Sequence, residues 1–226
     1  MSILYNLANL LSIFDKRQSQ GIIMDRVIAY IDGFNLYFGL KEKGWKRFYW
    51  LNIQAMVQRL LSDDQVLVRT KYFTSRVKYP AAKRKRQSTF LDALSTLPDF
   101  DIYYGRYQLN DQECYHCHNT FKIHNEKKSD VNLSVEMLAD AFQDRFDVAF
   151  LVSADADLAA PVSKVRTLFP GKKIVVALPP ERSSFELNNL ASQVIPIGRG
   201  VIARSQFPDQ IVTTSGYVLN RPTEWK

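Results

Sequence analysis

The feature that most constrains the fold is a repeated alternation of short apolar runs with amphipathic stretches of helical period. The runs DVAFLVS (Asp147–Ser153) and KIVVAL (Lys173–Leu178) are almost wholly apolar, which is typical of strands covered on both faces. Strands that alternate with helices predict a parallel sheet with helices on both sides. The expected fold class is therefore α/β, a three-layer sandwich around a mostly parallel central sheet.

The same pattern predicts the individual elements. Strands are expected at Arg26–Asp32, Gln65–Phe73, Phe100–Leu109, Asp147–Ser153, Lys173–Leu178 and Val194–Ile197, with a short strand-like run at Phe121–His124. Helices are expected at Phe34–Lys41, Asn52–Leu61, Pro80–Leu97, Ser129–Phe142, Asp157–Phe169 and Ser183–Ala191. A length of 226 residues suits one domain, which we expect over residues 25–200 with a Cys/His insertion at about 110–126.

The two flanking segments are expected to be additions to this domain. Residues 1–24 begin with an uncharged stretch that is too short to span a bilayer and lacks the marks of a signal peptide. We interpret them as an amphipathic docking helix or a non-native start upstream of Met24, with a membrane-surface helix as the alternative. The turn-rich residues 201–226 form a C-terminal tail, expected to pack on the domain through Tyr217 or Trp225.

The sequence has two cysteines, Cys114 and Cys117, which excludes a secreted disulfide scaffold. A reducing, cytoplasmic compartment is therefore expected. We also expect no membrane partner.

The net charge of +7 favours a polyanionic partner. This charge is concentrated, because Gln65–Leu91 contains eight cations and no acid. The other 199 residues hold 22 cations and 23 acids, a net charge of −1.

This basic segment has two interpretations. A run of charge is commonly a solvated helix face, but here Tyr72, Phe73 and Tyr79 accompany it, and cations with aromatic rings are how unpaired nucleic acid is held. Two further lysines lie beside Asp130. The hypothesis is that nucleic acid is contacted by Arg76, Lys78, Lys83, Arg84, Lys85, Arg86, Lys127 and Lys128.

Four aspartates are candidates for chemistry. Asp32 ends the first strand, Asp155 and Asp157 follow the DVAFLVS strand, and Asp130 opens a helix. Each alone could be a turn or capping residue, but ligands of open parallel sheets bind beyond the carboxyl ends of the strands. Carboxylates that converge there repel one another unless a cation lies among them. Oxygen ligands without histidine favour Mg²⁺ or Mn²⁺, which can activate water for attack on phosphorus.

Three blocks carry a family resemblance: YIDGFNLYFGL (Tyr30–Leu40), SDVNLSVEMLADA (Ser129–Ala141) and LVSADADLAAPV (Leu151–Val162). They resemble the signature blocks of NYN-domain proteins, in the branch once called a domain of unknown function and related to the LabA-like proteins. The resemblance runs from about Arg26 to the closing RPTEW (Arg221–Trp225). It implies a PIN-like, Rossmannoid fold and a metal-dependent nuclease that acts mostly on RNA.

The resemblance also implies roles for individual residues. The acidic pocket of the family maps to Asp32, Asp130, Asp155 and Asp157, and its asparagine maps to Asn35. We hypothesise that Asp32 and Asp155 contact the metal directly, whereas Asp130 and Asp157 bind it through water or complete a second site. Asn35 would orient a carboxylate or the scissile phosphate. Ser153 either adds a hydroxyl to the pocket or is a hydrogen-bonded structural serine.

The window CYHCHNTFKIH contains every cysteine and histidine of the chain. A Cys-x₂-Cys pair is half of a structural zinc site, and our preferred ligand set is Cys114, Cys117 and His124 with His118 or an outside group. A metal-free reduced pair and a redox switch are the alternatives, and zinc shared across a homodimer is another arrangement. An insertion with a Cys-x₂-Cys is familiar at this place among NYN relatives, which supports a small structural lobe.

Three functions remain open from the sequence. The first is a Mg²⁺/Mn²⁺-dependent endoribonuclease, and the second is a non-catalytic module that binds RNA or protein on the NYN fold. The third is a phosphoryl-transfer enzyme acting on a small nucleotide. The basic segment and the lack of a Gly-rich phosphate loop such as GxxxxGK disfavour this third function.

Overall fold

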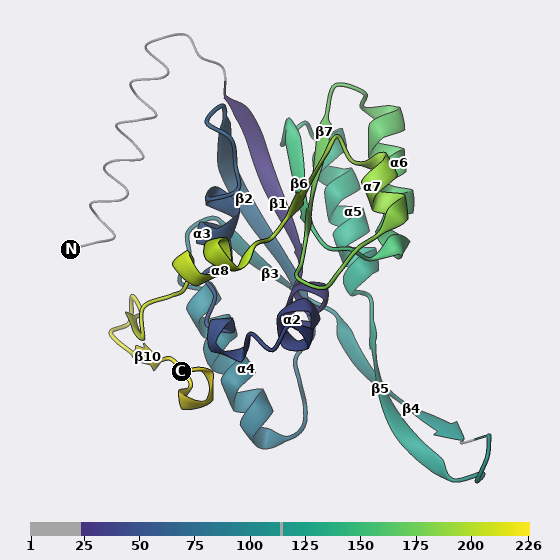
Figure 1. Ribbon diagram of the computed structural model, residues 1–226, viewed down its shortest axis with the longest axis vertical. Coiled ribbons are helices and arrows are strands. Elements are labelled where there is room, and N and C mark those ends of the chain that lie inside the picture. The colour runs from purple at the N-terminus through teal and green to yellow at the C-terminus, as the bar shows by residue number, and fades with distance from the viewer. Residues whose placement is uncertain (1–23, 114) are drawn as a thin grey trace.

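The central element of the computed structural model is a six-stranded sheet in which every strand is parallel, flanked by helices (Figure 1). The structure describes residues 24–113 and 115–226, without the side chains of 106–112 and 121–127. The strand order is β3-β2-β1-β6-β7-β8. The strands are β1 (Asp25–Asp32), β2 (Gln65–Thr74), β3 (Phe100–Tyr104), β6 (Val148–Val152), β7 (Lys173–Leu178) and β8 (Gln193–Pro196). The α/β prediction is confirmed.

The middle of the sheet is formed by β1 and β6, which are mostly buried. β1 and β6 pair in parallel, with Tyr30 opposite Leu151 and Ile31 opposite Val152, and all five residues of β6 are buried. The strand order runs outward from this pair in both directions. The strand order therefore reverses at the carboxyl ends of β1 and β6, which is where open α/β sheets bind their ligands.

Helices cover both faces of the sheet and bury a separate apolar cluster on each (Figure 1). One face carries α2 (Gly33–Glu42), α3 (Ile53–Gln58), α4 (Ala81–Leu94) and α8 (Arg199–Arg204), with the short 3₁₀ helix η1 (Lys46–Phe48). The other face carries α5 (Ser129–Phe142), α6 (Ala159–Leu168) and α7 (Phe185–Leu190), with the 3₁₀ helix η2 (Ala156–Leu158) before α6.

The prediction of a single strand over Phe100–Leu109 is wrong. β3 ends at Tyr104, and after Gly105 the chain leaves the sheet as β4 (Arg106–Glu113), which pairs antiparallel with β5 (Thr120–Lys127). The resulting hairpin projects away from the body of the molecule (Figure 1). The break falls at Gly105, beyond which the chain pairs with β5 instead of β2.

Helix α5 has the predicted bounds, but the apolar spacing that indicated it does not mark its buried face. Val131, Val135 and Phe142 are 63%, 57% and 68% exposed, whereas Leu133 and Met137 are buried. The exposed and the buried apolar residues both recur at helical spacing. The pattern therefore predicts a helix but does not identify the face that packs on the sheet.

The C-terminal residues lie over the α4 side of the molecule (Figure 1). They form β9 (Gln210–Val212), β10 (Val218–Asn220) and the 3₁₀ helix η3 (Thr223–Trp225). Trp225 is 8% exposed and contacts Tyr49, Trp50 and Phe90, whereas Tyr217 is exposed. The division into 1–24, 25–200 and 201–226 stays a prediction, since residues 1–23 lie outside the described part. Over residues 24–113 and 115–226, no helix is long and apolar enough to cross a membrane.

Candidate active site

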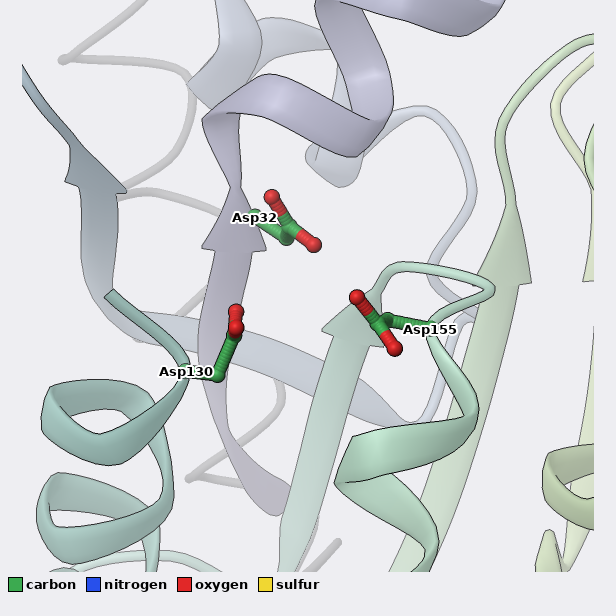
Figure 2. Close-up of side chains that lie close together, drawn as sticks. All are labelled: Asp32, Asp130 and Asp155. Atoms are coloured by element: carbon green, nitrogen blue, oxygen red, sulfur yellow. The ribbon is translucent and has the colours of Figure 1, made fainter. Parts of the chain in front are cut away.

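Three aspartates from three different elements converge at the carboxyl ends of β1 and β6. One carboxylate oxygen each from Asp32, Asp130 and Asp155 lies within 4.8 Å of the other two. Figure 2 shows Asp32 at the end of β1, Asp130 at the start of α5 and Asp155 in the loop after β6, all pointing toward one another. The expected convergence at this edge of the sheet is therefore present for three of the four aspartates.

Asp32 has both a structural task and a place in the cluster. Its Oδ1 caps α2 by accepting from the backbone N–H groups of Phe34 (3.1 Å) and Asn35 (3.0 Å). Its Oδ2 accepts from the Ser153 hydroxyl at 2.9 Å, and the residue is only 5% exposed. The capping role that the sequence left open is thus real and coexists with the cluster.

Ser153 and Asn35 hold the loop that carries Asp155. The Ser153 Oγ accepts from the Asp155 backbone N–H at 3.0 Å while it donates to Asp32, and the Asn35 Oδ1 accepts from the Ala154 N–H at 3.1 Å. Asp155 in turn caps η2 by accepting from the Asp157 N–H at 3.0 Å. These bonds lock two carboxylates and the loop into one arrangement.

Asp130 and Asp157 differ in position. Asp130 lies in the first turn of α5, where the helix dipole favours an anion, two residues after the exposed Lys128. Asp157 is exposed and is not part of the three-carboxylate cluster. Its carboxylate nevertheless acts on the site, because Asp155 and Asp157 both raise the pKa of Asp130 after the larger effect of burial.

The electrostatics of the cluster fit a hard divalent cation. Burial raises the pKa of Asp32 from 3.8 to about 6, hydrogen bonds from Asn35 and Ser153 lower it in part, and Asp130 and Asp155 raise it further. Three carboxylates so close together repel one another unless a cation lies among them. Oxygen donors of this kind are the ligands that Mg²⁺ and Mn²⁺ take, so the residues present fit such an ion.

The raised pKa of Asp32 predicts a pH-dependent cost in the metal-free protein. Between about pH 4 and pH 6 the folded state binds more protons than the unfolded state, so this group lowers the free energy of unfolding as the pH rises through that window. At pH 7 the cost approaches about 3 kcal/mol. Asp32→Asn should remove it and raise the free energy of unfolding at pH 7, because the amide oxygen can still cap α2.

The measurement is urea denaturation in EDTA at pH 5 and pH 7.5. The difference between wild type and Asp32→Asn should grow toward pH 7.5. The control is Asp92→Asn, at an exposed aspartate on α4. Its difference in free energy of unfolding from wild type should be the same at both pH values. A constant offset between Asp32→Asn and wild type at both pH values would contradict the assignment.

A buried ion-pair network fixes the helix that carries Asp130. The Nζ of Lys71, on β2, lies 2.6 Å from carboxylate oxygens of both Glu136 and Asp140 on α5. Asp140 also accepts from the Tyr30 hydroxyl at 2.7 Å, and both Lys71 and Asp140 are almost fully buried. Burial lowers the pKa of Lys71, but the hydrogen bonds to the two carboxylates raise it above its ordinary value.

The basic segment divides between structure and surface. Lys71 is buried in this network, and Arg69 pairs with Asp101 at 2.9 Å. Tyr72 and Phe73 are buried in the core and cannot stack on a base, so that part of the interpretation is wrong, whereas Tyr79 is 73% exposed.

The residues predicted to contact nucleic acid lie mostly at the surface. Arg76 stacks over Tyr104, and Arg84 and Lys85 are exposed on α4. Lys83 and Arg86 face the opposite flank of that helix, where Arg86 pairs with Glu224 at 2.7 Å. Lys78 and Lys128 are exposed, and the side chain of Lys127 lies outside the described residues.

The proposed zinc ligands are only partly described: Cys117 and His118 lie between β4 and β5, whereas His124 lies within β5, opposite Leu109. Cys114 and the side chain of His124 are outside the described residues. Cys117 is exposed, and the His118 Nδ1 lies 2.6 Å from a carboxylate oxygen of Glu113. The zinc set therefore stays a prediction.

Sequence reasoning missed an aromatic surface beside the acid cluster. Phe34, Tyr37 and Phe38 follow Asp32 on α2 and line a cavity of about 580 Å³. The signal was available, because residues three and four apart share one face of a helix. It was hidden by the apolar character of the block, which reads equally well as core.

Comparisons with known proteins find similarity by sequence and by fold. A relative with 26% identity over 177 residues is 6-hydroxy-3-succinoylpyridine 3-monooxygenase HspA from Pseudomonas putida (strain DSM 28022 / S16). That match covers 62% of this chain, which spans about half of the relative, 55% of its length. The crystal structure of a protein of unknown function, VPA0982 from Vibrio parahaemolyticus RIMD 2210633, shares the fold with a TM-score of 0.53 and 16% identity. The match covers 78% of this chain and 95% of the Vibrio chain.

The model of the NYN domain family matches residues 26–198, from the first strand to the end of the last strand of the sheet. That span includes all three clustered aspartates and most of the chain. The protein belongs to the NYN domain family.

Proposed function

We propose that this protein is a metal-dependent nuclease, an endoribonuclease that hydrolyses phosphodiester bonds at the Asp32, Asp130 and Asp155 cluster. The observation that carries the proposal is the meeting of three carboxylates at the strand-order reversal of a NYN domain. A pure binding module, the alternative, has no need for three carboxylates beside the phosphates that it would bind.

Each residue of the site has a role in this proposal. Asp32 and Asp155 would hold a Mg²⁺ or Mn²⁺ ion, with Asp130 completing the set and Asp157 acting through water. The ion would supply an activated water and neutralise charge that develops on the phosphate. Ser153 and Asn35 are positioning residues, because they fix the Asp155 loop against Asp32 and α2.

The decisive experiment incubates single-stranded and structured RNA and DNA with the protein in Mn²⁺ or EDTA. Cleavage by wild type in Mn²⁺, lost in EDTA and in Asp155→Asn, is the expected result. Binding without cleavage under all conditions would favour the non-catalytic module, and hydrolysis of free nucleotides alone would favour the third function.

The exposed cations of α4 are proposed to contact the phosphates of the bound strand. Neutralising two of them in Arg84→Gln/Lys85→Gln should weaken RNA binding and reduce the slope of log affinity against log salt by about 1.4, at roughly 0.7 per lost contact with single-stranded nucleic acid. Binding titrations at several salt concentrations measure both quantities.

The matched control is Lys164→Gln/Arg204→Gln, which removes the same charge from exposed positions on α6 and α8. A slope that falls equally in both double variants would mean that only net charge matters. An unchanged slope in the α4 variant would exclude this helix from binding.

A second candidate comes from the Pseudomonas relative, whose name describes a monooxygenase of a substituted pyridine. The aromatic cavity beside Asp32 is the observation in its favour, since it suits a flat ring. Mass spectrometry of 6-hydroxy-3-succinoylpyridine incubated with the protein, a reductant and air tests it: a product that has gained oxygen would replace the nuclease proposal.

A further inference from the structure

A cavity of about 580 Å³ lies between α2, η1, α4 and Trp225, next to the acid cluster. We call it the aromatic pocket and define it by Phe34, Tyr37, Phe38, Tyr49, Lys83 and Arg86. Its size is within the ~300–1,000 Å³ range of sites for small organic groups. None of the three clustered aspartates lines it, but Gly33 and Phe34, which directly follow Asp32, do. The pocket is therefore adjacent to the proposed reaction site.

The start of α2 is built to allow this proximity. A side chain at Gly33 would place its Cβ 2.5 Å from the Tyr72 ring and 2.8 Å from the Phe73 carbonyl oxygen. Only glycine permits α2 to begin so close to β2. The helix thus presents Asp32 at its capping end and the aromatic side chains one turn later, on one short rigid element.

The aromatic rings form a surface suited to a flat ligand. Phe34 and Phe38 stack with centroids 6.2 Å apart, Tyr37 contacts Phe38 edge-on at 5.4 Å, and Tyr37 contacts Tyr49 at 5.2 Å. Phe38 is 38% exposed, so part of its ring is free to meet a ligand. Nucleobases of unpaired strands stack on such rings with little dependence on sequence.

The charge of the lining selects among flat ligands. Four cations line the pocket, namely Lys41, Lys46, Lys83 and Arg86, and none of its described lining residues is acidic. The Nζ atoms of Lys41 and Lys83 lie 5.6 Å and 5.7 Å from the ring centroids of Phe38 and Tyr37. The ligand should therefore combine a planar heteroaromatic ring with a negative charge close by.

We propose that the aromatic pocket receives one unstacked nucleobase of the strand whose phosphate approaches Asp32. This deepens the proposed function, on which it rests for the position of the strand. The base would stack on Phe38, and Lys83 would lie beside a neighbouring phosphate. A free heteroaromatic acid has the same chemistry, so the test separates a base within a strand from a free ring.

The experiment measures binding without cleavage. Full-length Asp155→Asn in EDTA is titrated with a fluorescent single-stranded RNA hexamer and with the same backbone lacking its bases. Stacking of one base predicts that the intact strand binds about 5- to 150-fold more tightly than the abasic strand. Adding Phe38→Ala should bring that ratio close to 1, and Phe38→Trp should preserve it.

Phe185→Ala, added to Asp155→Asn at a 77% exposed aromatic on α7, is the matched control and should keep the ratio of Asp155→Asn alone. Uridine monophosphate should displace the intact strand. A ratio that Phe38→Ala leaves unchanged in a folded protein, or tighter binding of nicotinate than of the mononucleotide, would overturn the proposal. The binding titration and the cleavage assay are separate, so the two proposals can fail independently. Tighter binding of the intact strand without cleavage by wild type would reject only the proposed function. Cleavage by wild type with equal binding of the intact and abasic strands would reject only this inference.

Discussion

Replacing Asp155 with asparagine is expected to slow RNA cleavage by more than about 100-fold. Loss of groups that merely support metal ligands already costs roughly 10- to 100-fold in affinity or activity, and Asp155 is proposed to contact the ion itself. The fold should be retained, because the asparagine Oδ1 can still accept the Asp157 N–H that Asp155 now accepts at 3.0 Å. The value of kcat/KM on a labelled single-stranded RNA in Mn²⁺, with Mn²⁺ affinity measured in parallel, checks the result.

Two further substitutions make this measurement specific. Asp157→Asn should have a smaller effect, since Asp157 lies outside the three-carboxylate cluster and acts on Asp130 through its charge. Asp92→Asn, at an exposed position near the C-terminal end of α4 and outside the cluster, should have none. Equal cleavage and equal Mn²⁺ affinity for wild type and Asp155→Asn would remove the aspartate cluster from the mechanism.

Lys71→Met is expected to lower the free energy of unfolding by about 3–5 kcal/mol, which is the usual cost of removing one partner of a buried ion pair. The remaining carboxylate of Asp140 is 1% exposed and would keep the Tyr30 hydroxyl and a 3.3 Å contact to Arg145. Glu136 is partly exposed and can be hydrated instead. Urea denaturation measures the loss.

The comparison variants separate burial from charge. Arg69→Met removes a neighbouring cation of β2 whose side chain is 44% exposed, and should cost no more than about 1 kcal/mol. The double variant Lys71→Met/Asp140→Leu should recover much of the loss, because neither charge then stays buried alone. If Lys71→Met and Arg69→Met cost the same, the network does not hold α5 against the sheet.

The parts of the fold that could be predicted from sequence are those with an unambiguous physical signal. β6 and β7 are buried on both faces, and short apolar runs rich in β-branched residues are typical of such strands. The ends of Ser129–Phe142 are right because a charged, polar segment precedes it and a helical spacing fills it. The outward direction of Val131 and Val135 could not be predicted, since it depends on how Lys71 holds Glu136 and Asp140.

The candidate site was predictable for the residues that end strands. Asp32 and Asp155 follow apolar runs, and parallel strands bring their carboxyl ends to one edge. The placement of Asp130 in the site rests on the family resemblance and on its position at the start of a helix. Asp157 lies outside the three-carboxylate cluster because it is part of η2, which Asp155 caps. The aromatic pocket could not be predicted, because it depends on contacts between residues far apart in sequence. Trp225 lines the pocket and contacts Phe90 of α4, and Glu224 pairs with Arg86 of the same helix.

The strand order also bears on when the aspartate cluster is assembled as the chain folds. β1 pairs with β2, its nearest strand in sequence, but its other neighbour is β6, and the bond from Ser153 to Asp32 joins residues 121 positions apart. Contacts so distant along the chain carry the largest loop-closure entropy and tend to form late. Asp32 belongs to one half of the molecule, while Asp130 and Asp155 belong to the other half, beyond the projecting hairpin. Neither half alone contains all three clustered aspartates, so under the proposed function a partly folded chain would not cleave the RNA around it.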